Sequence, residues 1–86
     1  MKIKNEFILH YEDDRLLIVS DKFQDFEPLT INEMDAVLFE QLKNGISSKE
    51  QLLNAVLGRF DISTVLALSE IDLFLKELKE NEMLEA

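Results

Sequence analysis

The sequence contains no cysteine, one histidine, one proline and two glycines. Without cysteine the chain can form neither disulfides nor thiolate metal sites, which fits a reducing cytosol. Two glycines are too few for a phosphate-cradling loop, and the only histidine, His10, has no evident partner for acid–base chemistry. The N-terminus lacks the apolar run of a signal peptide, and no apolar stretch approaches the roughly 18 residues that cross a bilayer. These absences predict a soluble, cytoplasmic protein that is not an enzyme.

Positive charge is also scarce. Nine Lys and Arg residues stand against eighteen Asp and Glu residues, for a net charge of −9. A nucleic-acid binder needs basic groups that displace counterions from phosphates, and an anionic membrane surface attracts basic groups as well. We therefore expect neither nucleic acid nor a membrane as a partner. The acidity either serves solubility or attracts a partner that carries basic groups.

At 86 residues the chain is expected to be one domain. Residues 6–20 have the pattern of a β-hairpin, in which two apolar runs flank a polar turn at Glu12-Asp13-Asp14. Neither run alternates, so we expect part of the second face to be covered by another chain or by a C-terminal element. Residues 21–27 read as a loop. A following strand over Glu27–Ile31 must lie at a sheet edge or direct the nitrogen of Pro28 away from its pairing neighbour, because Pro28 has no N–H to donate.

Three helices are predicted after this strand. The first covers residues 33–43, with Asn32 as its N-cap and Asn44-Gly45 as its end, where either residue can take the left-handed conformation. The second begins at a capping box, Ser47 to Glu50, and ends at Gly58. The third covers residues 64–80 after the N-cap Ser63, and its core face is formed by Ala67, Ile71, Phe74, Leu75 and Leu78. Met83-Leu84 is expected to return to the core. These elements define an α+β fold.

No group of residues suggests catalysis or metal binding. Glu12-Asp13-Asp14 lacks the ligand spacing and the glycine of a calcium loop, and Ser47-Ser48 lacks the surroundings of a nucleophile. We therefore expect no cofactor and no metal. Leu66 and Leu73 lie seven residues apart on the side of the third helix opposite its core face. They predict either a contact patch for self-association, as in a homodimer, or partial cover by the hairpin.

Three segments, in order, resemble the PqqD family, whose fold is called the RiPP recognition element (RiPP: ribosomally made, post-translationally modified peptide). Residues 29–36 read Leu-Thr-Ile-Asn-Glu-Met-Asp-Ala, where the family typically has Ile-Thr-Leu-Asn-Glu-Thr-Gly-Ala. Residues 60–62 read Phe-Asp-Ile, similar to the family's Tyr-Asp-Val. The tail from Phe74 to Leu84 is similar to Phe-Leu-x-x-Leu-x-x-x-Gly-Leu-Leu. The resemblance covers nearly all of residues 1–86 and implies a three-stranded antiparallel sheet followed by three winged-helix-like helices.

The resemblance implies a non-catalytic adaptor that binds the leader segment of a precursor peptide and presents it to a peptide-modifying enzyme, of which radical SAM enzymes are one class. The leader would add as a strand beside the third helix, by β-augmentation. Carried over by position, the peptide-binding residues would be Phe26, Glu27, Leu29, Ile31, Leu68, Asp72, Leu75 and Lys79.

Other functions remain open at this point. The helix trio is similar to that of winged-helix DNA-binding regulators, although the acidity opposes this function. A homodimeric interaction module joined through the hairpin and Leu66/Leu73 is compatible with peptide binding. A small metal-dependent enzyme is disfavoured by the single histidine.

Overall fold

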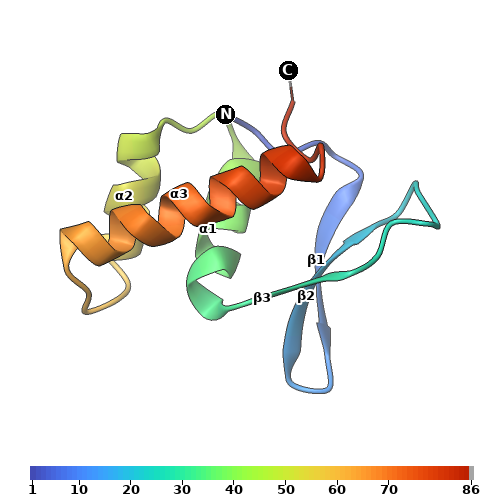
Figure 1. Ribbon diagram of the computed structural model, residues 1–86, viewed down its shortest axis with the longest axis horizontal. Helices are drawn as coiled ribbons and strands as arrows, with labels where there is room; N and C mark the ends of the chain where they lie inside the picture. Colours follow the sequence, from blue (N-terminus) through green and yellow to red (C-terminus); the bar gives the residue numbers. More distant parts are fainter. Residues whose placement is uncertain (86) are drawn as a thin grey trace.

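The computed structural model describes residues 1–85 as a small sheet followed by three helices (Figure 1). The elements are β1 (Phe7–Glu12), β2 (Arg15–Ser20), β3 (Leu29–Ile31), α1 (Glu33–Asn44), α2 (Lys49–Leu57) and α3 (Thr64–Glu80). The three strands form one antiparallel sheet in the order β1-β2-β3. The predicted α+β fold, with a three-stranded antiparallel sheet before three helices, is therefore confirmed.

The hairpin forms because two aspartates accept backbone angles that most residues avoid. Asp13 and Asp14 have φ angles of 48° and 65° between the paired residues Glu12 and Arg15. Two consecutive positive φ angles form a primed turn, whose twist matches that of the flanking strands. The predicted polar turn is confirmed.

The third strand is shorter than predicted, because it begins at Leu29 rather than at Glu27. The chain turns before this point, where the Phe26 N–H donates to the Phe23 carbonyl. The Phe26 ring packs edge-on against Phe7, with 5.1 Å between the ring centroids. Residues 26–28 therefore lie outside the sheet, and the strand begins after Pro28.

Two predicted helix caps are confirmed and two details are corrected. Asn32 and Ser63 cap α1 and α3 through their side chains. The capping box of α2 lies one residue later than predicted, at Ser48 and Gln51, because Ser47 is buried and its hydroxyl donates to the carbonyl of Gln41 in α1. α1 ends without a left-handed residue, since its C-cap Gly45 is extended at φ 176°.

The core lies between the sheet and the helices. The five residues predicted for the inner face of α3 are all buried, and they pack with residues of the sheet, α1 and α2 in one apolar cluster. Met83 is fully buried, and Leu84 bridges to Ile3, which confirms the returning C-terminal segment. This segment pairs with the N-terminal residues. On the second face of the hairpin, Leu17 is buried at 5% exposure, whereas Ile8 stays 40% exposed. Across residues 1–85, no helix is long and apolar enough to span a membrane.

Candidate functional site

The two edges of the sheet differ in their access to another strand. On β1, the Lys43 side chain of α1 donates to the carbonyl of Asn5 at 2.7 Å and also to the carbonyl of Phe7. A lysine placed on an edge strand is a common protection against unwanted strand pairing. Lys43 therefore occupies the N-terminal part of the β1 edge.

Replacing Lys43 tests this protection directly. We expect Lys43→Ala to lower the free energy of unfolding by about 1–3 kcal/mol, because two carbonyls lose a charged donor. The variant should also associate more readily than wild type through the opened β1 edge. Urea denaturation and light scattering over a range of protein concentrations measure both effects. Unchanged stability and unchanged association would contradict this role for Lys43.

The β3 edge presents one residue for pairing, Thr30. The Asp21 N–H donates to the Glu6 carbonyl at 2.9 Å, which extends the β1–β2 ladder by one hydrogen-bonded pair. Hydrogen-bonded and non-bonded pairs alternate along an antiparallel ladder. By this alternation Leu29 and Ile31 bond to β2, whereas Thr30, opposite Leu17, directs its N–H and C=O to the open edge.

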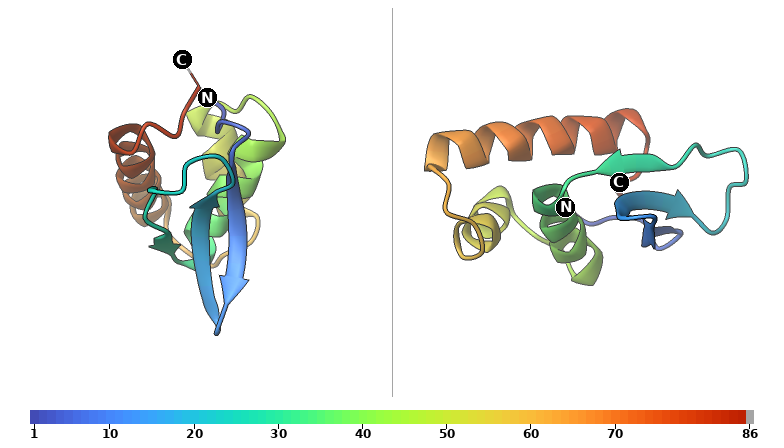
Figure 2. Two further views of the ribbon diagram at one scale, coloured as in Figure 1. Left: turned by 90° about the vertical axis from the view of Figure 1, so that its right-hand side faces the viewer. Right: turned by 90° about the horizontal axis from the view of Figure 1, so that it is seen from below.

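One flank of α3 faces this edge. The Asn32 side-chain N–H reaches the Glu70 carboxylate at 3.5 Å, which ties the end of β3 to α3. By helical spacing, Leu66, Leu73 and Glu77 lie on the same side of α3 as Glu70. In Figures 1 and 2, β3 runs beside α3, with no element between them. The leucine pair predicted for self-association, 60% and 62% exposed, therefore lies on the flank of α3 that faces β3.

The opposite flank of α3 carries three of the residues predicted to bind peptide, and it faces away from β3. Asp72 forms an ion pair with Lys49 at the start of α2, at 2.5 Å. Lys79 lines a shallow hollow with residues of both chain ends, and Leu68 lies on this side by its spacing from Asp72. The structure therefore does not bring these three residues together with the strand.

The strand residues predicted to bind peptide do lie at or near the β3 edge. Ile31 is buried against the core, whereas Phe26 and Leu29 are half-buried and Glu27 is exposed. Leu75 of α3 is buried at 7% exposure, so it belongs to the core. At the β3 edge, a ligand can therefore contact mainly the backbone of Thr30, and the apolar side chains of Phe26 and Leu29 lie nearby.

An acidic cluster lies where α1 meets α3, and we define it as Asp35, Glu70 and Glu77. Asp35 is only 8% exposed, and its Oδ1 has no hydrogen-bond partner. The pKa of Asp35 is raised from 3.8 to about 8. The largest cause is burial, followed by a hydrogen bond with Glu70 and by the negative charges of Glu70 and Glu77. A backbone hydrogen bond at Asn32 acts in the opposite direction and lowers the pKa. Asp35 is therefore mostly protonated at neutral pH.

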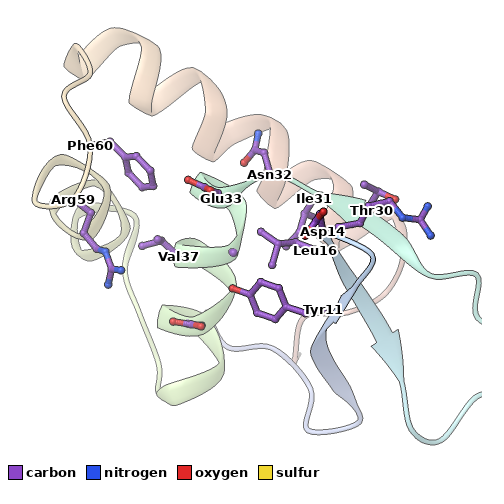
Figure 3. A pocket seen from close by; sticks show the side chains of 13 residues that line it. Tyr11, Asp14, Leu16, Thr30, Ile31, Asn32, Glu33, Val37, Arg59 and Phe60 are labelled. Carbon is purple, nitrogen blue, oxygen red and sulfur yellow. The ribbon is translucent and has the colours of Figure 1, made fainter.

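A hollow of about 760 Å³ lies between the tip of the hairpin, the end of β3 and α1, and Thr30 and Ile31 line it (Figure 3). Its wall is partly apolar, with Leu16, Ile31, Val37 and Phe60, and the Tyr11 side chain lies between β1 and α1 (Figure 3). In the part of the chain that the structure describes, no three acidic or histidine side chains are placed to hold a metal ion. The hollow shows no arrangement of nucleophile and base.

Sequence reasoning missed Asp35, Glu70, Glu77 and the outward backbone of Thr30. A signal for Asp35 exists, since it lies at helical spacing with the buried residues Leu38, Phe39 and Leu42. An acid on an apolar helix face is unusual unless it is paired.

No protein-family profile matches the sequence, and no curated protein matches it. A solved structure nevertheless shares the fold. It is described as TbiB1 in complex with the TbiA(beta) leader peptide, and it aligns over 100% of this chain and 96% of its own, with a TM-score of 0.77 and 19% identity. At this identity the likeness establishes the fold alone. Membership of the PqqD family therefore stays a prediction.

Proposed function

We propose that this chain is a non-catalytic adaptor that binds the leader segment of a ribosomally made precursor peptide as a strand added to β3. The observation that carries the proposal is the open β3 edge beside α3, together with the occupation of the N-terminal part of the β1 edge by Lys43. The comparison supports it, because TbiB1 has the same fold and its structure is a complex with a leader peptide. Strand addition supplies backbone hydrogen bonds to almost any peptide, and side-chain pockets then select among peptides.

The groove in this proposal is formed by residues 26–31 on one side and by the β3-facing flank of α3 on the other. Thr30 supplies the backbone donor and acceptor, and Leu29 and Phe26 form an apolar wall. On α3, Leu66 and Leu73 take the place that the sequence had assigned to Leu68, Asp72 and Lys79. Their exposure in the absence of a ligand fits a surface that a peptide covers.

The bound precursor would be held near a peptide-modifying enzyme, a radical SAM enzyme being one candidate class. Tethering of this kind raises the effective concentration of the substrate without any catalytic group on the adaptor. Such a role requires no cofactor on this chain.

The alternative of a winged-helix regulator receives little support from α3. This helix carries four acidic residues and two lysines, and a recognition helix in a DNA groove needs exposed basic or amide side chains. Self-association through Leu66 and Leu73 competes with peptide binding for the same surface. If the protein forms a dimer through this surface, binding of a peptide should convert the dimer to monomers.

A display library of random 12-residue peptides provides a probe that does not require the natural precursor. We expect selection against the wild-type protein to yield peptides that shift backbone amide signals of residues 28–32 and 66–77 in nuclear magnetic resonance spectra. Shifts confined to the hollow near Tyr11 and Phe60, or a library without binders, would contradict the proposed function.

Substitution of Leu73 tests the helix wall of the groove. We expect Leu73→Glu to weaken binding of a selected peptide about tenfold, because an apolar anchor is replaced by a charge. Val65→Glu is the matched control, since Val65 is also exposed, at 77%, and lies on the flank of Leu68 and Asp72. Titration calorimetry measures both affinities. Equal affinities in the two variants would exclude Leu73 from the groove.

A further inference from the structure

Asp35 is a buried acid, and one of its two carboxyl oxygens has no hydrogen-bond partner. It follows β3 by four residues, in the first turn of α1, and packs toward α3. Its Oδ1 has neither solvent contact nor a hydrogen-bond partner. A buried acceptor without a partner costs about 1–3 kcal/mol, so it needs an explanation in a native structure, and a partner that the isolated chain lacks is one such explanation.

The groups that face Asp35 are all acids or amides. The side chain of Asn32 caps the same helix turn, and Glu70 and Glu77 approach from α3. The two ion pairs among residues 1–85 join Lys49 to Asp72 and Lys76 to Glu80. Neither pair includes a member of the acidic cluster, so among residues 1–85 no lysine or arginine forms an ion pair with it.

We propose that the acidic cluster receives a Lys or Arg side chain of a peptide bound along β3. The inference rests on the proposed function and adds the type of residue that the groove selects. A cationic side chain brings N–H donors and a positive charge to Glu70 and Glu77, which are half-buried in front of Asp35. Charge-assisted hydrogen bonds of this kind are roughly twice as strong as neutral ones.

The position of the cluster fits a side chain from an added strand. Alternate side chains of a strand point to the same face of the sheet, and α3 lies beside β3 (Figure 2). The Asn32–Glu70 contact places the cluster at the end of β3, next to the path of such a peptide. Glu70 and Glu77 are half-buried, so they remain accessible at the mouth of the cluster. The net charge of −9 also attracts basic peptides.

A double-mutant cycle with a library-selected peptide tests the inference. We expect the selected peptides to share a Lys or Arg at one position, and its replacement by norleucine to weaken binding to wild type about tenfold or more. In Glu70→Gln the same replacement should change the affinity less than about threefold, because the partner charge is gone. Glu50→Gln in α2 removes the same charge outside the groove and should behave as wild type. Thermal unfolding confirms that each variant is folded.

The outcomes separate this inference from the proposed function. Peptides that lose binding in Thr30→Pro but carry no shared basic residue would overturn the inference and leave strand addition intact. A norleucine effect that persists unchanged in Glu70→Gln would also overturn it. Peptides that bind Thr30→Pro as tightly as wild type, or a library without binders, would overturn the proposed function and the inference with it.

Discussion

Asp35→Asn should make the protein more stable than wild type at pH 8 and leave its stability nearly unchanged at pH 4. In the folded protein the pKa of Asp35 is raised from 3.8 to about 8, first by burial and then by Glu70 and Glu77. Between these pH values the folded chain holds a proton that the unfolded chain has released. The contribution of Asp35 to stability is therefore complete below about pH 4 and is lost as the pH rises to about 8.

The gain in stability of Asp35→Asn depends on two opposing effects on the charged carboxylate, its burial and its attraction to the helix N-terminus. One pKa unit corresponds to about 1.4 kcal/mol, whereas the favourable interaction of an acid with a helix N-terminus contributes only about 0.3–1 kcal/mol. Burial therefore outweighs the helix dipole at this position. Asparagine has the same shape, carries no charge and can donate to Glu70. The full shift from 3.8 to about 8 corresponds to roughly 6 kcal/mol. Because relaxation and water penetration around an ionised carboxylate reduce this, we expect the variant to gain a few kcal/mol over wild type by pH 8.

Urea denaturation from pH 4 to pH 9 measures this difference. Glu33→Gln is the control, because Glu33 is an exposed acid in the same helix turn. This control should keep the pH dependence of wild type. Parallel curves for wild type and Asp35→Asn would show that Asp35 titrates normally in the folded chain.

Much of the fold could be predicted from local patterns, because each signal has a short-range physical cause. The core face of α3 follows from helical spacing, and the caps Asn32 and Ser63 follow from side chains that accept backbone N–H groups. The capping box was misplaced because two adjacent serines offer the same local chemistry. Only the contact of Ser47 with Gln41 in α1 decides between them.

The candidate site could be predicted only on its strand side. A helical wheel identifies the core face of α3 but treats the two flanks as equivalent, since either could face the sheet. The choice depends on where α2 and β3 lie, and these positions follow from packing in the apolar core. The Lys49–Asp72 and Asn32–Glu70 contacts show which flank faces which element. The direction of the Thr30 backbone likewise depends on the register with β2.

Thr30→Pro should weaken strand addition at least about tenfold while leaving the sheet intact. By the register, the Thr30 N–H faces the open edge, so its removal breaks no hydrogen bond to β2. Proline is tolerated in edge strands at such positions, and the extended residue before it is compatible with the ring. With Pro28 already present, the edge would then have no donor from residue 28 to residue 30.

We expect a selected peptide to bind Thr30→Pro at least about tenfold more weakly than wild type. The lost backbone hydrogen bond accounts for about 1 kcal/mol, and the proline ring also occupies space that the added strand needs. Titration calorimetry gives the affinities, and thermal unfolding shows whether the variant retains its fold.

Thr30→Val is the matched control, because valine keeps the N–H and the β-branched shape. It should bind the peptide within about threefold of wild type, since the threonine side chain lies on the outer face of the sheet and its hydroxyl is not part of the edge. A folded Thr30→Pro variant with the affinity of wild type would exclude β3 as the strand to which the peptide adds. Because the open edge carries the proposed function, that single result would remove its structural basis.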